Sequence, residues 1–318
     1  MKRISVETNP NDLDDERLPT LRDVGVNRLS VAVQSFDDKL LQEMQRYEKY
    51  GGGEQIKQRL MRTRGEFETL NVDMIFNLPH QTEASLMHDL HVITAEINAD
   101  QGSFYPLMSS DSTVRSMRKD MGKVDYRREK TLYKLIVRDM LDAGYQRSSA
   151  WCFSRHKSMI DKYITEQNDY LGLGSGAFSY LDGGIYSSTF SINHYLKLIE
   201  AGEVGIVRHR SVDSTDQMRY YLMMRMFSGA LDLHDAEARF RGQFRHSLRA
   251  ELLRLRLIGA ISGDELEIRL TERGFYIWVM MMREFFTGVN NLREEMRLNI
   301  SSELELLAPE ALKKDIVN

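Results

Sequence analysis

The sequence has only one cysteine, Cys152, in 318 residues. One thiol cannot form a disulfide within the chain, and it cannot supply a metal site that needs several cysteines from this chain alone. Its neighbours Trp151 and Phe153 favour a buried and unreactive thiol, and a thiol that faces a substrate is the alternative. Cys152 is therefore a secondary candidate for a catalytic residue.

Long apolar runs and a strong net charge are also missing. No run approaches the roughly 20 apolar residues that cross a bilayer, and the first ten residues lack the apolar core of a signal peptide. The formal net charge of −4 gives no overall basic field that would attract nucleic acid. With 42% hydrophobic and 28% charged residues, the sequence predicts a cytoplasmic globular protein that engages neither nucleic acid nor a membrane.

The first third of the chain alternates between two kinds of pattern. Short runs with the character of strands occupy residues 3–7, 28–34, 71–76 and 102–105, and helical patterns occupy residues 14–23, 37–61 and 83–96. Strands that alternate with helices indicate βαβ units and a parallel sheet. The pattern fits either an open doubly wound sheet or an incomplete (β/α) barrel.

The rest of the chain is predicted to contain three further parts. A helix at residues 126–143 ends at Gly144, and SYLDGGIYSS is typical of a hairpin with its turn at residues 182–184. Later helices are followed by a two-strand wing, which indicates a winged-helix module. We therefore divide the chain into a barrel at 1–125, an α/β segment covering the barrel at 126–212, a mainly helical winged-helix-like domain at 213–290 and a charged tail at 291–318.

Three weaker candidates for sites have plainer explanations. Gly172, Gly174 and Gly176 lie before a hairpin, whereas a dinucleotide fingerprint needs a helix there, so a tight turn is favoured. His88 and His91 lie three apart on a predicted helix without a third ligand nearby, so a solvated helix face is favoured over a metal site. The arginines of the winged-helix module are interleaved with acids, which favours an accessory role over DNA binding.

Polar residues in the predicted strands are harder to explain. Glu7 and Gln34 end strands, and Asp73 interrupts the apolar run NVDMIF. Strands of a parallel sheet covered on both faces should be nearly all apolar, and each polar group left unpaired on burial costs about 1–3 kcal/mol. A shared ligand at the carboxyl-terminal mouth of a barrel would explain them, with Arg46 clamping a carboxylate. The set suits an amino-acid moiety joined to a nucleoside; the alternative is a polar interior satisfied by water and neighbouring groups.

Several motifs occur together in one order: SVETNP (5–10), GVNRLSVAVQSF (25–36), Arg46, NVDMIFNLPHQT (71–82) and DYLGLGSGAFS (169–179). In this order they resemble the radical S-adenosylmethionine (radical SAM) enzymes of the oxygen-independent coproporphyrinogen III oxidase type. The resemblance implies a partial (β/α)6 barrel. It also implies that S-adenosyl-L-methionine contacts Glu7, Gln34, Arg46 and Asp73, with backbone contacts at Met108 and Phe178.

Two further stretches, 103–112 and 148–156, look more like the haem-utilisation branch of this family, the ChuW/HutW type. That likeness implies a radical SAM methyltransferase that opens the haem macrocycle anaerobically and releases iron. Its partners would be haem or a related tetrapyrrole and an electron donor such as flavodoxin. Coproporphyrinogen III oxidase activity and a haem-binding chaperone are the alternatives, and Asn77 stands where the family usually has glycine.

The CxxxCxxC loop of the family is missing from the sequence. In the family this loop binds a [4Fe–4S] cluster through three thiolates, which a chain with one cysteine cannot supply. The resemblance implies that the sequence starts at the third strand of the barrel, as an N-terminally truncated form. We expect such a chain to bind S-adenosyl-L-methionine weakly and to show no turnover.

Overall fold

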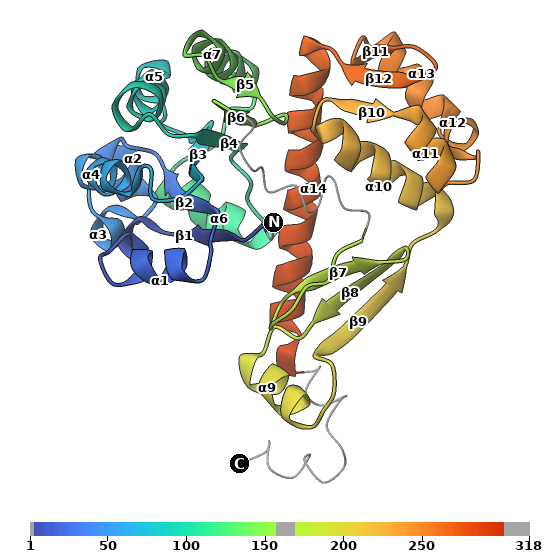
Figure 1. Cartoon of the computed structure of the whole chain (residues 1–318), viewed down its shortest axis with the longest axis horizontal. Coiled ribbons are helices and arrows are strands. Elements are labelled where there is room, and N and C mark those ends of the chain that lie inside the picture. The colour runs from blue at the N-terminus through green and yellow to red at the C-terminus, as the bar shows by residue number, and fades with distance from the viewer. Residues whose placement is uncertain (1–2, 157–168, 302–318) are drawn as a thin grey trace.

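The structure is a computed structural model that describes residues 3–156 and 169–301. Its largest sheet has six strands in the order β1-β2-β3-β4-β6-β5 (Figure 1). The strands are β1 (Ser5–Thr8), β2 (Arg28–Gln34), β3 (Thr69–Phe76), β4 (Gln101–Pro106), β5 (Gln146–Arg147) and β6 (Cys152–Ser154). β1 to β4 are parallel, and β6 runs antiparallel to β4. The four strands predicted for the first third are thus confirmed, with ends that differ by at most two residues.

Helices cover one face of this sheet, on which the strands carry large apolar side chains such as Leu29, Val31 and Val72, all fully buried. Figure 1 shows α4, α5 and α7 along this side. The helices of this lobe are α1 (Arg17–Asp23), α2 (Asp38–Glu43), α3 (Tyr47–Tyr50), α4 (Gly53–Thr63), α5 (Glu83–His91) with the π-helical turn η2 (Val92–Ile97), α6 (Asp111–Asp120) and α7 (Glu129–Asp142); a short 3-10 helix, η1 (Pro10–Asp12), follows β1.

The single helical pattern predicted at residues 37–61 is three helices in the structure. Gln45 and Gly51 have φ angles of 57° and 87°, and a left-handed residue ends an α-helix. The breaks bring Arg46 to the start of α3. Apolar spacing alone did not reveal them, because the buried side chains on both sides of each break face the same core.

The second lobe contains α10 (Ser214–Phe227), β10 (Ala230–Asp232), α11 (Leu233–Arg239), α12 (Phe244–Ser247), α13 (Arg249–Leu257), β11 (Ile261–Gly263) and β12 (Glu267–Leu270). Its three strands form an antiparallel sheet in the order β10-β12-β11. Helices followed by the β11–β12 hairpin are the predicted winged-helix-like arrangement.

A third sheet contains β7 (Phe178–Leu181), β8 (Gly184–Ser188) and β9 (Ile206–Ser211), with α9 (Ile192–Glu200) between β8 and β9. The turn between β7 and β8 consists of Asp182 and Gly183, with φ angles of 46° and 73°. Two successive positive φ angles are what a type I′ hairpin turn requires. The hairpin is therefore confirmed, and Gly184 is already the first residue of β8 rather than part of the turn.

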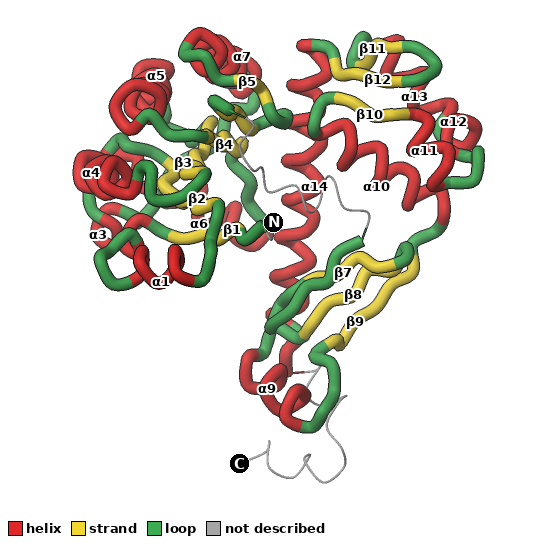
Figure 2. The backbone as a smooth tube through the Cα atoms, in the orientation of Figure 1, coloured by secondary structure: helices red, strands yellow, loops and turns green. Residues whose placement is uncertain are grey.

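The last described helix, α14 (Glu272–Leu298), runs between the lobes along much of the molecule (Figure 2). It crosses residue 290, where the sequence predicted the start of a charged tail. The helix continues because Met296 is only 2% exposed and packs against Ser187 of β8. Residues 302–318 of the predicted tail lie outside the described residues.

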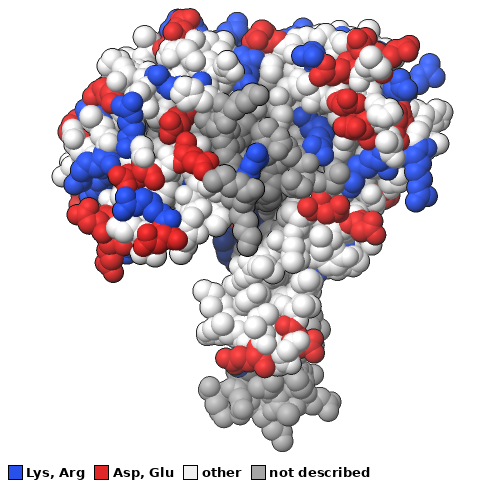
Figure 3. Space-filling model, viewed as in Figure 1, with Lys and Arg blue, Asp and Glu red and all other residues white. Residues whose placement is uncertain are grey.

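The described surface gives two further observations. On the face drawn in Figure 3, acidic and basic side chains are interspersed over both upper lobes. Among residues 3–156 and 169–301, no helix is both long enough and apolar enough to cross a bilayer.

Candidate functional site

The main sheet has one apolar face and one polar face. Residues paired across neighbouring strands lie on the same face of a sheet. The register aligns Glu7 with Ser30, Ser30 with Asn71, and Asp73 with Ser103. The same face continues from β1 to β6 and carries Ser5, Glu7, Arg28, Ser30, Asn71, Asp73, Gln101, Ser103, Tyr105, Cys152 and Ser154. Glu7 and Asp73 therefore belong to a continuous polar surface, which we call the polar face.

Arg28 connects the amino-terminal half of the polar face. Arg28 is 3% exposed, and its guanidinium donates to Gln101 Oε1 and Ser5 Oγ, each at 3.0 Å. Gln101 in turn donates to Ser154 Oγ at 2.9 Å, so the hydrogen bonds extend from β1 to β6. A buried arginine with these partners holds a fixed positive charge beneath the carboxylates of the same face.

Asp73 lies at the centre of the polar face and is 9% exposed. Its Oδ2 accepts from Ser30 Oγ at 2.6 Å, and its Oδ1 accepts from Asn71 Nδ2 at 2.7 Å. The Tyr105 hydroxyl also bonds to this carboxyl group. Burial raises the pKa of Asp73, while the hydrogen bond from Ser30 and the charge of Arg28 act in the opposite direction.

Tyr105 connects the two acids of the polar face. Burial raises its pKa well above the ordinary value, and the charges of Asp73 and Glu7 raise it further. Its hydroxyl is therefore a proton donor throughout the physiological range. The charges of both carboxylates act on the Tyr105 hydroxyl, so Glu7 and Asp73 lie near the same side chain, as expected from their positions in the strands.

Gln34 and Arg46 lie beside the carboxyl-terminal end of β2. Gln34 is its last residue, is half-buried and has a φ angle of 78°. Arg46 donates through Nη2 to the carbonyl oxygen of Ala32, the residue paired with Asp73 in the sheet register. The guanidinium carbon lies 4.4 Å from the ring centroid of Tyr50, and burial lowers the pKa of Arg46. Its Nε is buried and has no hydrogen-bond partner among the described residues.

The structure thus places Glu7 and Asp73 on the polar face, in the carboxyl-terminal halves of β1 and β3. Gln34 ends β2, where it pairs with Met74 beyond a shift in the register, and Arg46 lies at the start of α3. Their role in ligand binding stays a prediction. Met108 follows β4 at the same end of the sheet and is half-buried. Phe178 begins β7 in the third sheet, where its ring packs against Phe190 at a centroid distance of 6.3 Å. The guanidinium carbon of Arg293 in α14 also lies 5.8 Å from the centroid of this ring, so Phe178 is placed apart from the main sheet.

Cys152 lies on β6 at the polar face but is only 4% exposed. Ser103 Oγ lies 3.6 Å from its Sγ. Burial raises the pKa of the thiol to about 11, so the thiol is protonated at neutral pH. This environment agrees with the expectation of a buried and unreactive thiol. His88 and His91 are exposed on α5, as expected of a solvated helix face.

Sequence reasoning missed Arg28, Ser30, Asn71 and Tyr105 as parts of the site. Their signal was present as the alternation of polar and apolar residues in RLSVAVQ, TLNVDMIF and QGSFYP. Taken one at a time, these polar residues look like interruptions of strands that are apolar on both faces. In fact, only one face of the sheet is apolar, and the other is mainly polar, with Ala32 and Ile75 as apolar members.

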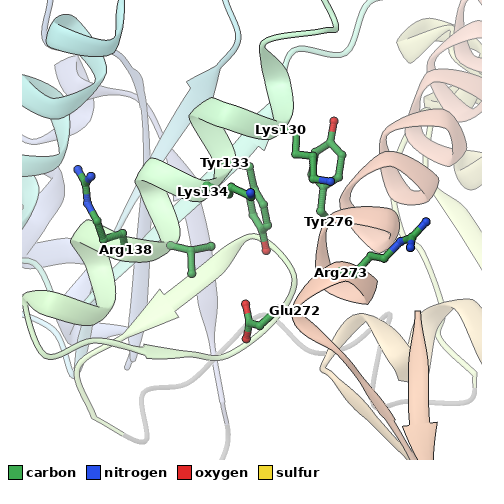
Figure 4. Close-up of a pocket in the computed structure, with 8 residues that line it drawn as sticks. Lys130, Tyr133, Lys134, Arg138, Glu272, Arg273 and Tyr276 are labelled. Atoms are coloured by element: carbon green, nitrogen blue, oxygen red, sulfur yellow. The ribbon is translucent and has the colours of Figure 1, made fainter. Parts of the chain in front are cut away.

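A separate cavity of about 430 Å³ lies between α7 and the start of α14 (Figure 4). Its lining includes Lys130 and Lys134 of α7, Glu272 and Tyr276 of α14, and Tyr133, whose hydroxyl donates to the carbonyl oxygen of Ala150. None of the predicted site residues lines this cavity. The candidate site is therefore the polar face.

The fold of this chain is similar to that of a solved α/β radical SAM enzyme. The Radical SAM superfamily model matches residues 1–93. Coproporphyrinogen III oxidase (HemN) from Escherichia coli, described as a radical SAM enzyme, has a similar structure with a TM-score of 0.72 at 21% identity, covering 88% of this chain and 69% of that chain. The predicted fold class, a partial barrel followed by a mainly helical domain, is confirmed by this structural likeness.

Comparisons of the sequence with characterised proteins give similarities to heme chaperones and to coproporphyrinogen III oxidases. The heme chaperone HemW of Lactococcus lactis is 26% identical over 90% of this chain and 76% of its own length. HemW of Bacillus subtilis is 30% identical over 63% of this chain and 53% of its own length. The oxygen-independent coproporphyrinogen III oxidase of Helicobacter pylori is 25% identical over 89% of this chain and 65% of its own length. The chain is thus similar to radical SAM proteins of the coproporphyrinogen oxidase and heme chaperone type.

The superfamily implies S-adenosyl-L-methionine and a [4Fe–4S] cluster. Within residues 3–156 and 169–301, no group of three or more His, Cys, Asp or Glu residues is arranged to hold a metal ion. The whole sequence has one cysteine, which is buried. The residues of this chain therefore do not fit a cluster held by three thiolates.

Proposed function

We propose that the polar face binds S-adenosyl-L-methionine at the carboxyl-terminal ends of β1 to β3. Arg46 carries the proposal: its half-buried guanidinium contacts Ala32 near the carboxyl-terminal end of β2, and its Nε has no partner among the described residues. A carboxylate is the natural partner of such a guanidinium, because it accepts two parallel hydrogen bonds. Open sheets of this kind bind ligands outside the carboxyl ends of their strands.

The other residues suit the remaining groups of the ligand. Glu7 is exposed and can accept hydrogen bonds from an ammonium group. The amide of Gln34 can both donate to and accept from ribose hydroxyls. Asp73 already accepts hydrogen bonds from Ser30, Asn71 and Tyr105, so we assign it mainly the task of fixing Tyr105.

We further propose that the ligand handled together with S-adenosyl-L-methionine is haem or a related tetrapyrrole. The relatives named above are heme chaperones and coproporphyrinogen oxidases. We favour haem binding by this chain, since a carrier needs none of the thiolates that the sequence lacks. Oxidative decarboxylation of coproporphyrinogen is the second candidate, supported by the likeness to the oxidases. None of these relatives is named as a methyltransferase, so that activity stays a prediction from two motifs.

Two titrations of the purified chain test these proposals. Equilibrium dialysis against radiolabelled S-adenosyl-L-methionine should show saturable binding that is weakened at least about tenfold in Gln34→Ala, the loss expected for one or two hydrogen bonds. Titration with haem should give a saturable Soret band without any new tetrapyrrole product by mass spectrometry. Decarboxylated porphyrin in an anaerobic assay with coproporphyrinogen would instead favour the oxidase, and no binding in either titration would exclude both proposals.

A further inference from the structure

Asp89 of α5 is a fully buried carboxylate, with a relative exposure of 0%. It lies 53 and 54 positions along the chain from the residues that it contacts: Oδ1 accepts from the backbone N–H of Phe36 at 2.7 Å, and Oδ2 accepts from Ser35 Oγ at 3.0 Å. No described Lys, Arg or His forms an ion pair with it. A buried carboxylate without a cation is costly, so its presence here needs an explanation.

The residues that Asp89 contacts follow Gln34 directly. Gln34 has a φ angle of 78°, a left-handed conformation that is uncommon for residues other than glycine and costs free energy unless its surroundings impose it. Ser35 Oγ also accepts from the backbone N–H of Asp37 at 3.1 Å. The turn from β2 to α2 is therefore tied to α5 through Ser35 and Phe36.

On the other side of Gln34, Arg46 donates to the carbonyl oxygen of Ala32. Gln34 thus lies between two anchors, one formed by Arg46 and one formed by Asp89. A hydroxyl or an amide could accept the single N–H of Phe36 at a lower desolvation cost than a carboxylate. Only a carboxylate accepts from both Phe36 and Ser35 without presenting a donor of its own.

We propose that Asp89 is a positioning residue that fixes the Ser35–Phe36 turn and thereby presents the Gln34 amide to the ligand of the polar face. This inference rests on the proposed S-adenosyl-L-methionine site. It adds a residue from the helical layer, outside the polar face, to the determinants of that site.

The chain offers a matched control. Asp100 also uses its carboxylate to accept a backbone N–H, that of Leu70 at 2.9 Å, at the amino-terminal end of β3. Asp89→Asn and Asp100→Asn therefore make the same chemical change at opposite ends of the sheet. We expect Asp89→Asn to weaken binding of S-adenosyl-L-methionine about tenfold, and Asp100→Asn to change it less than about twofold.

A double-mutant cycle tests positioning directly. In a Gln34→Ala background, Asp89→Asn should cause little further loss of affinity, because the group that Asp89 positions is already absent. Additive losses, or equal losses in the two Asp→Asn variants, would reduce Asp89 to a purely structural role and overturn the inference. If Asp89→Asn does not fold, Ser35→Ala removes one hydrogen bond to the same carboxylate and should show a smaller loss with the same coupling.

A ligand-free measurement separates this inference from the proposed function. Hydrogen exchange of residues 34–37 and the NMR signal of the Gln34 side-chain amide should both change in Asp89→Asn and stay as in the wild type in Asp100→Asn. If the wild type binds no S-adenosyl-L-methionine, the proposed function fails, and these two signals still decide whether Asp89 positions Gln34. Unchanged signals in Asp89→Asn would overturn the positioning role.

Discussion

Glu129 of α7 and Arg283 of α14 form an ion pair whose side chains are only 1% and 13% exposed. Tyr276 of α14 also donates to Glu129, at 3.1 Å between its hydroxyl and Oε1. The carboxylate of Glu129 thus joins the helical layer of the main sheet to the long helix. Burial lowers the pKa of Arg283, but the charge of Glu129 and its hydrogen bond leave the value raised overall.

Removing this carboxylate should destabilise the fold strongly. We expect Glu129→Ala to lower the free energy of unfolding by about 3–5 kcal/mol, because it removes the buried partner of Arg283 and leaves this largely buried charge with only the exposed Glu284. Glu284 is the control, since it contacts the same guanidinium but is 69% exposed. Glu284→Ala should cost less than about 1 kcal/mol in the same urea denaturation experiment. Equal losses of unfolding free energy in the two variants would contradict the special role of Glu129 as the buried partner of Arg283.

The pH dependence of stability should report on Asp89. Burial raises its pKa from 3.8 to about 7, and the charge of Asp37 adds to this effect, whereas Phe36 and Ser35 lower it. An acid whose pKa is raised by folding contributes stability that is fully present below its unfolded pKa and is lost as pH rises through its folded pKa. The free energy of unfolding should therefore fall between about pH 4 and 7 on account of this group, by roughly 4 kcal/mol at most.

Asp89→Asn removes this titration. The difference in unfolding free energy between Asp89→Asn and the wild type should rise in favour of the variant from pH 4 to 7 and level off above it, because other groups titrate equally in both proteins. Urea denaturation at half-unit pH intervals gives this difference. A difference that does not vary with pH would show that Asp89 has an ordinary pKa.

Cys152 should be unreactive in the folded protein. Its thiol is buried and its pKa is raised to about 11, so at pH 8 almost no thiolate is available to an alkylating reagent. Iodoacetamide should label Cys152 slowly at pH 8 and rapidly once the chain is unfolded in guanidinium chloride. Fast labelling of the folded chain would show that Cys152 is reactive and would contradict this prediction.

Arg46 should be essential for binding S-adenosyl-L-methionine. Arg46→Met removes the carboxylate-binding group and keeps much of the side-chain volume, so we expect affinity to fall by about tenfold to a hundredfold. Arg46→Lys should restore only part of it, since an ammonium group lacks the planar pair of donors. Arg22→Met, at an exposed arginine paired with Glu66, serves as the control and should bind like the wild type.

The strands of the main sheet were predictable because their side chains repeat with a period of two. Glu7, Gln34 and Asp73 were found for the same reason, since each breaks an apolar pattern. The rest of the polar face was missed because its residues seemed acceptable one at a time, and only the strand register shows that Arg28 and Tyr105 face the same side. Asp89 was missed because its partners, Ser35 and Phe36, are more than fifty residues away.

The length of α14 was not predictable from its own sequence. The segment after residue 290 is rich in charges and gives a weak apolar pattern. Met296 near its end is buried against Ser187 of β8, which lies more than a hundred residues earlier in the chain. Such a dependence on a distant element cannot be read from a local pattern.

Because α14 contacts every lobe, it makes the three sheets mechanically interdependent. It bonds to the winged-helix lobe through Trp278, whose Nε1 donates to the carbonyl oxygen of Met223 at 2.9 Å. Asn291 Oδ1 accepts from the backbone N–H of Asp111 at 2.8 Å, just beyond the β4 loop that carries Met108. A small tilt of this helix would therefore move three parts of the protein together: the winged-helix lobe, the β7–β8 hairpin and the loop after β4 that carries Met108.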